Sequence, residues 1–162
     1  AKGYDPIVTN DDQVFEIGKV FPMRSGGDAL LITTGITLGH AMEATIELSA
    51  NGIEASVVHV PTVKPMDNEA LLELMVDIPV VVTAEEHTIV GGLGSAVAEL
   101  IAEANFDQAK RFRRVGLPDV FPNKYGSQDS LMANYAITAS NIVAVVTDLA
   151  DDRSPARQLA RP

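Results

Sequence analysis

The chain has 162 residues, 46% of them hydrophobic, and its 12 basic and 22 acidic side chains give a formal net charge of −10. This composition predicts one globular domain with its own core. The absence of cysteine excludes a disulfide scaffold, a thiol nucleophile and a cysteine-ligated metal centre, and it leads us to expect a cytoplasmic protein. We expect no nucleic-acid partner, since that needs clustered cations, and no membrane partner, since no apolar run approaches the roughly 20 residues that span a bilayer.

The charge is divided unevenly along the chain. Residues 1–109 carry 17 acidic and 4 basic side chains, a net −13, whereas residues 110–162 carry 5 acidic and 8 basic ones, a net +3. The basic side chains include a cluster at Lys110, Arg111, Arg113 and Arg114. We interpret this cluster as solvated charge at one end of a strand, facing an acidic partner, with a phosphate site as the alternative.

Strands are expected where short apolar or β-branched runs occur. Residues 1–27, with Asp5-Pro6 and Pro22, are interpreted as an extended segment that precedes the domain. The domain itself is expected over residues 28–150, and the polar residues 151–162 are expected to form a frayed tail. The predicted strands span 29–33, 55–60, 78–82 and 111–115.

Helices are predicted where apolar residues recur every three or four positions. Asn51-Gly52 is a helix stop, Asp67 can cap the second helix, and Thr138 or Ser140 can cap the last one. Because helices connect successive strands, the fold class is predicted as α/β, a three-layer α/β/α open sheet, mostly parallel, with about five strands. The predicted helices span 36–50, 67–76, 94–104, 128–135 and 141–149.

The stretch from Val82 to Ser95 is the one that suggests a site. It leaves a buried strand, places three ionisable residues at the carboxyl end of that strand, and makes a glycine turn into a helix. Ligands of open α/β sheets bind at that edge, and a helix start offers unpaired N–H groups to an anion. The alternative is that the glycines only let strand and helix approach closely. The candidate anion or interface site comprises Glu85, Glu86, His87, Gly91, Gly92, Gly94 and Ser95.

The known catalytic patterns are incomplete in this chain. The dinucleotide fingerprint that begins at Gly92 fails at Val97, and the P-loop, zinc and G-x-S-x-G patterns do not occur. His87, between carboxylates and the turn, is a candidate proton shuttle or charged partner, whereas His40 and His59 are interpreted as structural. We therefore predict no catalytic residue, no cofactor-binding residue and no metal ligand in this chain.

Four blocks of sequence resemble a known family. They are Phe15–Lys19 (FEIGK), Thr62–Asp67 (TVKPMD), Thr83–Val97 (TAEEHTIVGGLGSAV) and Val115–Asp119 (VGLPD). In this order they resemble the C-terminal domain of transketolases, a domain that also occurs in deoxyxylulose-phosphate synthases and in the β subunits of 2-oxo acid dehydrogenases. The resemblance extends from about residue 6 to residue 149.

The resemblance implies a domain of an enzyme that moves two-carbon ketol units between sugar phosphates. In that family thiamine diphosphate and a divalent metal, Mg or Ca, are held by two other domains, and residues 1–27 look like the connector from the second of them. We therefore expect this chain alone to bind no cofactor and to be inactive. The partners implied are a second copy, forming a homodimer, and the cofactor-binding domains or subunit of the same enzyme.

The resemblance also implies that the main role of the glycine turn is structural or interfacial, and that binding a regulatory anion is a further role. The other candidate interface residues are Lys64, Asp119, Arg113 and Arg114. Three readings of the chain stay open at this point. It is a domain of a transketolase, a domain of a synthase or 2-oxo acid dehydrogenase relative, or a stand-alone anion-binding or assembly module at Gly94-Ser95. As a piece of an enzyme it is a cleavage product, a cloned piece or a separate subunit, and the start at Ala1 favours the first two.

Overall fold

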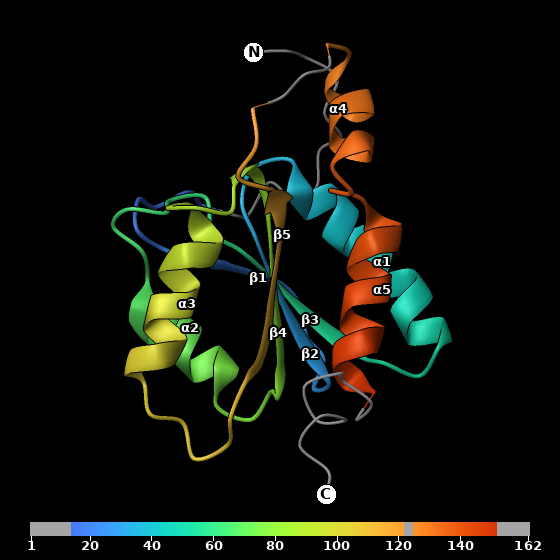
Figure 1. Cartoon of the computed structure of the whole chain (residues 1–162). Helices are drawn as coiled ribbons and strands as arrows, with labels where there is room; N and C mark the ends of the chain where they lie inside the picture. The colour runs from blue at the N-terminus through green and yellow to red at the C-terminus, as the bar shows by residue number, and fades with distance from the viewer. Residues whose placement is uncertain (1–13, 122–124, 152–162) are drawn as a thin grey trace, which may run out of the picture.

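The computed structural model describes residues 14–121 and 125–151, which form a five-stranded sheet between two layers of helices (Figure 1). The strand order is β1-β3-β2-β4-β5, in which β1 is antiparallel to β3 and the other neighbours are parallel. This confirms the predicted α/β fold class. The strands are β1 (Phe21–Arg24), β2 (Ala29–Thr33), β3 (Ala55–His59), β4 (Val80–Thr88) and β5 (Arg111–Leu117).

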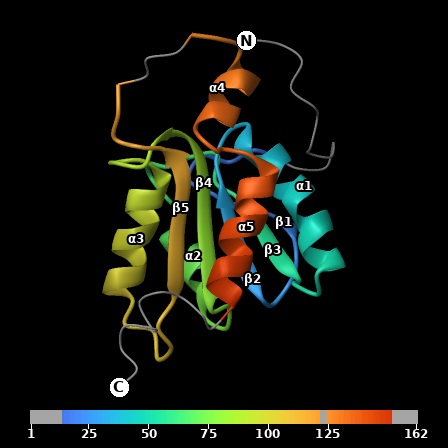
Figure 2. The same ribbon diagram turned by 45° about the vertical axis from the view of Figure 1, so that its right-hand side comes forward.

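Helices cover both faces of the sheet, with α2 and α3 on one side and α1 and α5 on the other (Figures 1 and 2). The predicted caps of two helices are present. Asp67 accepts a hydrogen bond from the amide of Ala70 (3.5 Å) at the start of α2, and Thr138 accepts one from Asn141 (3.2 Å) at the start of α5. The helices are α1 (Thr37–Ala50), α2 (Asn68–Met75), α3 (Leu93–Glu103), α4 (Gln128–Asn134) and α5 (Ala139–Ala150).

The expected connector, residues 1–27, contains the edge strand β1, which pairs with β3 from Phe21 opposite His59. Arg24, the last residue of β1, holds this strand against the rest of the domain through its side chain. The guanidinium donates to the carbonyl of Ala55, to Ser49 Oγ (2.9 Å) and to the carboxylate of Glu54. The sheet therefore begins before residue 28, while residues 1–13 and most of the expected tail, 152–162, lie outside the described residues.

Strand β4 is the main departure from the predicted elements, because it spans Val80–Thr88 instead of residues 78–82. The apolar run ends at Val82, but the pairing with β5 continues from Thr83–Arg114 and Ala84–Val115 to Thr88–Leu117. The register shifts between the last two pairs, so β4 bulges there. Glu85, Glu86 and His87 therefore lie within the strand and not beyond its end.

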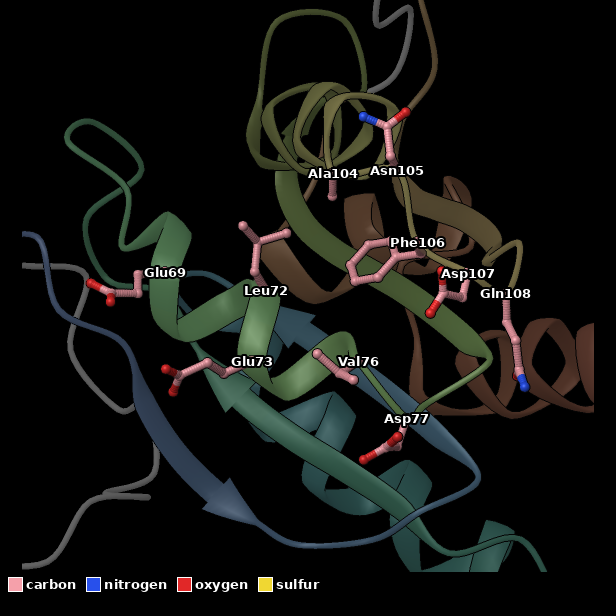
Figure 3. A pocket seen from close by; sticks show the side chains of 10 residues that line it. All are labelled: Glu69, Leu72, Glu73, Val76, Asp77, Ala104, Asn105, Phe106, Asp107 and Gln108. Atoms are coloured by element: carbon pink, nitrogen blue, oxygen red, sulfur yellow. The ribbon is translucent and has the colours of Figure 1, made fainter.

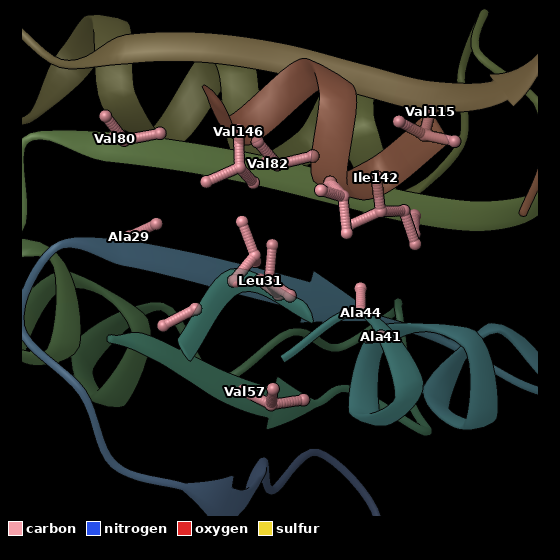
Figure 4. Close-up of a cluster of buried hydrophobic side chains, with 14 of the residues drawn as sticks. Ala29, Leu31, Ala41, Ala44, Val57, Val80, Val82, Val115, Ile142 and Val146 are labelled. Atoms are coloured by element: carbon pink, nitrogen blue, oxygen red, sulfur yellow. The ribbon is translucent and has the colours of Figure 1, made fainter. Parts of the chain in front are cut away.

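The larger half of the core lies between the sheet and helices α1 and α5 (Figure 4). Leu31 and Val82 on neighbouring strands are 1% exposed and pack in the same cluster as Ile142 and Val146 of α5. Small side chains of α1, such as Ala41, let that helix lie close to the sheet. Truncating a fully buried leucine such as Leu31 to alanine is expected to cost about 3 kcal/mol or more of stability.

The segment Gln128–Ala150 is long and apolar enough to cross a membrane by length and composition alone. In the structure it is two helices, α4 and α5, separated by Ala136, whose φ is 56°. Because Ile142 and Val146 are buried in the core, the apolar face of α5 is explained by packing against the sheet.

Candidate functional site

Glu85 is the centre of the predicted site, and it lies inside the protein with only 1% of its surface exposed. Its carboxylate accepts hydrogen bonds from the first two residues of α3, the amides of Leu93 and Gly94, each at 2.8 Å. The helix dipole and two charge-assisted hydrogen bonds offset the cost of burying the carboxylate. The anion at the start of α3 is therefore supplied by the protein itself, and these two amides are not free to bind an external one.

The glycines around Glu85 make room for its side chain and for neighbouring groups. A Cβ on Gly92 would lie 1.9 Å from Glu85 Oε2, and one on Gly116 of β5 would lie 3.0 Å from Glu85 Cγ. A Cβ on Gly94 would lie 2.7 Å from the side chain of Arg114. Only Gly91, at φ 76°, is required by the backbone turn. Close approach of strand and helix thus accounts for Gly92 and Gly94, as the alternative reading of the glycines predicted.

Ser95 and Arg114 hold the loop between β4 and α3. Ser95 Oγ donates to the carbonyl of Ile89 (2.9 Å) and accepts from the amide of Gly91 (2.9 Å). Arg114 Nη1 donates to the same Ile89 carbonyl at 2.7 Å. Ser95 of the predicted site and Arg114 of the candidate interface residues are therefore both occupied in fixing the shape of the turn.

The three consecutive ionisable residues of β4 have separate surroundings. His87 is exposed, and its Nδ1 lies 3.0 Å from the carbonyl of Thr88, a hydrogen bond that leaves Nε2 as the acceptor in the neutral ring. Glu86 is also exposed and accepts from Gln128 Nε2 of α4, at 2.8 Å to both carboxylate oxygens. With Glu85 buried, the structure does not assemble these residues into one acid–base group.

A small cavity of about 190 Å³ lies beside Glu86, where α4 meets the ends of β4 and β5. The sequence analysis did not predict it, because its walls come from residues that are ordinary apolar positions of separate elements. The local indication of this cavity in the sequence is that Leu131 and Tyr135 lie four positions apart in the predicted helix 128–135 and so share one face of it. The remaining walls are Leu117, Met132 and Ile137.

The other candidate interface residues are spread over the carboxyl edge of the sheet. Lys64 follows β3 and Asp119 follows β5, and both are exposed, but β2 and β4 lie between the two strands. Arg113 and Arg114 occupy consecutive positions of β5, so their side chains leave opposite faces of the sheet. Arg114 reaches the loop before α3, whereas Arg113 stays exposed on the other face.

The contacts of the other two histidines, His59 and His40, are those of structural residues. His59, at the end of β3, lies with Nδ1 3.3 Å from Thr33 Oγ1, and burial lowers the pKa of its imidazole. His40 lies 4.0 Å from the carboxylate of Glu43 on the surface of α1. Over residues 14–121 and 125–151, no three His, Asp or Glu side chains are grouped so that they could hold a metal ion.

Exposed apolar side chains gather at the same edge as the glycine turn. Seven of the nine large exposed hydrophobic residues described lie on segments at the carboxyl ends of the parallel strands, where the arrowheads point in Figure 1. We call this set the apolar edge. It comprises Val14, Phe15, Ile17, Val90, Val120, Phe121 and Tyr125.

Residues 18–142 match the family profile described as "Transketolase, C-terminal domain". The chain belongs to this family. It is 37% identical over 147 residues to the 6-deoxy-6-sulfo-D-fructose transketolase subunit of Clostridium sp. (strain MSTE9), covering 91% of this chain and 44% of that protein. It is 39% identical over 152 residues to the 1-deoxy-D-xylulose-5-phosphate synthase of Heliobacterium modesticaldum, covering 92% of this chain and 23% of the synthase.

Among solved structures, the domain is similar to a split-gene transketolase described as an inactive beta4 tetramer. The TM-score is 0.81 at 38% sequence identity, and the match covers 90% of this chain and 46% of the other. The chain thus spans less than half the length of the relatives that it matches. The family places the glycine turn and the apolar edge in a domain that is part of a larger protein in these relatives.

Proposed function

We propose that this chain is the C-terminal section of a thiamine-diphosphate-dependent, transketolase-type enzyme that transfers two-carbon ketol units between sugar phosphates. The family match over residues 18–142 carries this assignment. The apolar edge supports a contact with another protein, because exposed hydrophobic side chains are typical of a surface that a partner covers. We assign to that edge the contact with the cofactor-binding domains or subunit of the same enzyme.

The described residues do not fit thiamine diphosphate and its metal. A pyrophosphate needs free donors, and the helix start that best offers them is occupied by the carboxylate of Glu85. No cluster of possible metal ligands occurs in the described part of the chain. The proposed role is therefore to support the enzyme's assembly, with the cofactor and its divalent ion held by the other domains.

An assay of the chain with and without those other domains, supplied as a separate polypeptide, tests this role. Alone, the chain is expected to show no ketol transfer and no heat of binding with thiamine diphosphate and Mg²⁺ in calorimetry. Together, the two polypeptides are expected to bind and to be active. Micromolar cofactor binding by the chain alone would contradict the proposal.

A pair of charge substitutions locates the contact. Phe121→Asp, at a side chain that is 98% exposed on the apolar edge, is expected to weaken binding of the other domains by about 10-fold or more. Ile46→Asp is the matched control, because this side chain is 74% exposed but lies on α1, away from the edge. Equal effects of the two substitutions would remove the apolar edge from the interface.

We also propose that the chain forms a homodimer; the solved structure of the split-gene relative is described as a beta4 tetramer, which is a different oligomeric state. Sedimentation velocity over a range of concentrations is expected to show a dimer. A monomer at every concentration would remove the self-association and leave the family assignment intact. The cytoplasmic location stays a prediction.

A 1-deoxy-D-xylulose-5-phosphate synthase is the second candidate for the whole enzyme, because such a synthase is as similar to this chain as the transketolase subunit is. Measuring which product the assembled enzyme makes, a ketol-transfer product or 1-deoxy-D-xylulose 5-phosphate, separates the two. The stand-alone anion-binding module is not favoured, since Glu85 already occupies the start of α3.

A further inference from the structure

The strand β5 is the outermost strand on one side of the sheet, and no strand among the described residues pairs with its outer side (Figures 1 and 2). Its residues 111–115 pair with β4 in an unbroken parallel register. The amide of Arg111 donates to the carbonyl of Pro79 (2.8 Å), so residues 111, 113 and 115 direct their N–H and C=O groups toward β4. We call the opposite, outer side of residues 111–115 the β5 edge.

The backbone of the β5 edge has hydrogen-bonding groups without a partner in the described part of the chain. Because the direction of the N–H and C=O groups alternates, those of Phe112 and Arg114 point away from β4. No hydrogen bond to these backbone groups occurs within residues 14–121 and 125–151. Unpaired groups in this arrangement are a template for a further strand.

The other edge of the sheet is less suited to pairing. The edge strand β1 has four residues, and its Pro22 has no N–H to donate. Its register with β3 also shifts between Pro22 and Arg24. A short, irregular strand that contains proline resists the addition of another strand. Residues 111–115 contain no proline and no register shift, so the β5 edge is the one that can accept a strand.

The β5 edge is basic, although the whole chain has a net charge of −10. Residues 110–117 include four cations and no acidic residue. Arg111 and Arg113 leave the face of the sheet that carries α5, where Arg111 Nη1 donates to the carbonyl of Ala150 (3.4 Å). Arg113 is exposed. Among the residues that the structure describes, no carboxylate lies within 4.0 Å of any arginine of β5.

The opposite face of β5 has a different chemistry. The ring of Phe112 is half-buried and packs against the core cluster beneath α2 and α3. Arg114 lies on the same face, and its Nη1 is engaged by the carbonyl of Ile89 at 2.7 Å. A strand added here would therefore meet arginine side chains on one face and an aromatic ring on the other.

These features select one kind of occupant. Two β5 edges of separate copies would bring arginines against arginines, and like charges on neighbouring strands are destabilising. A nucleic acid offers phosphates to the arginines, but phosphate oxygens cannot donate to the outward carbonyls of Phe112 and Arg114. An extended peptide supplies both backbone donors and acceptors, and acidic side chains complement the arginines.

We propose that the β5 edge binds an extended acidic segment of another polypeptide, which adds a strand to the sheet. Carboxylates at every second position of that segment face Arg111 and Arg113. The residues between them are apolar and cover the ring of Phe112. This inference depends neither on the enzyme's activity nor on the contact assigned to the apolar edge.

Hydrogen exchange measured by NMR on the complete chain tests the proposal. The probe is a short, end-capped peptide that alternates glutamate and valine. When it is added, the amides of Phe112 and Arg114 are expected to exchange at least about 10-fold more slowly, because they gain a hydrogen bond. The amides of Arg113 and Val115 already face β4 and are expected to change far less. A contact with the arginine side chains alone would not produce this alternation.

A charge substitution and its matched control test the role of the arginines. Arg113→Glu is expected to weaken binding of the peptide by about 10-fold or more, and so is a high salt concentration. Lys64→Glu makes the same change of charge at an exposed residue after β3, so it is expected to leave the affinity unchanged. Neither side chain forms an ion pair within the described residues, so both variants are expected to fold.

Two altered peptides test the pairing itself. Methylation of the valine nitrogens removes the donors that would face the outward carbonyls of Phe112 and Arg114, and it is expected to weaken binding at least about 10-fold. Replacement of the glutamates by lysines is expected to abolish binding, because like charges then face each other.

Four outcomes would overturn the proposal. The peptide could leave the exchange of the Phe112 and Arg114 amides unchanged. The methylated peptide could bind as tightly as the unmodified one, which would reduce the contact to charge attraction. Protection of these amides that increases with the concentration of the chain alone would assign the β5 edge to a second copy. Binding of a single-stranded oligonucleotide, but not of the peptide, would assign the arginines to a nucleic acid.

Discussion

The two ends of the sheet are built from the same kind of connection, yet they handle charge in opposite ways. At the carboxyl ends of the strands the buried carboxylate of Glu85 is paired with the amides of α3, and seven of the nine large exposed hydrophobic side chains described lie at this end. At the amino ends a groove between α2 and the loop before β5, the acidic groove (Figure 3), leaves the carboxylates of Glu69, Glu73, Asp77 and Asp107 at the surface. The helix α3 presents its amide end to the first region, where it stabilises the carboxylate of Glu85, and its carbonyl end to the second region, where the dipole gives the carboxylates no such stabilisation.

This comparison also explains why a motif that looks like an anion site does not need an outside anion. A helix amino end requires a negative partner, and here the strand that leads into the turn provides one. What remains available to other molecules at that end is the apolar edge together with exposed polar side chains such as those of Glu86 and His87.

The largest effect is expected from Gly92→Ala at the carboxyl end. A Cβ at this position would lie 1.9 Å from Glu85 Oε2, so the buried carboxylate must leave the amides of α3. We expect a loss of about 3–5 kcal/mol in the free energy of unfolding, measured by urea denaturation. Gly39→Ala is the control, because a Cβ there meets nothing within 4 Å in the helix α1, and it is expected to be neutral or stabilising. Similar losses for both would contradict the account of Gly92.

A smaller loss is expected from Glu85→Gln. The amide keeps the shape of the side chain, but its nitrogen brings a donor against the amide of Leu93 or Gly94. The expected cost is about 2 kcal/mol in the same denaturation measurement. Glu86→Gln is the neighbouring control, since this exposed residue contacts Gln128 at the surface and is expected to change stability by less than about 0.5 kcal/mol. Equal changes in stability for Glu85→Gln and Glu86→Gln would contradict the structural role assigned to the buried carboxylate, and with it the comparison of the two ends.

The smallest effect is expected at the acidic groove. Glu73→Gln with Asp77→Asn removes two exposed charges that form no ion pair within 4.0 Å among the described residues, although Asp77 attracts Lys110 over a longer distance. We expect the free energy of unfolding to change by less than about 0.5 kcal/mol, with a weaker dependence on salt concentration. A loss as large as that of Glu85→Gln would mean that the groove carboxylates are part of the folded framework.

The fold could be predicted from the sequence because its signals are local. The apolar runs at 29–33 and 55–60 and the helical period of 36–50 gave the right element types, and Asp67 and Thr138 cap the helices as predicted. The edge strand β1 was missed because four residues that contain Pro22 show no strand pattern by themselves. They are held in place by Arg24 and by pairing with β3, which are contacts with residues about 30 positions away.

The candidate site was located by sequence but not resolved by it. The spacing of Glu85 and the glycines marked the right turn, whereas the length of β4 and the direction of each side chain depend on pairing with β5 and on the bulge between Ala84 and Thr88. Gln128 lies 42 positions from Glu86, and no pattern in the sequence connects them. Contacts of this range depend on how the elements pack.

The sequence by itself determined the layers, the family and the presence of a turn suited to a negative charge. Periodicity, caps and motif order carry that information residue by residue, because neighbouring backbone and side chains decide them. Only the tertiary structure decided which negative charge fills the turn, and that the acidic residues of α2 meet Asp107 of the loop before β5 in one groove. Both depend on distances between elements that are remote in sequence, and these are set when the sheet is assembled.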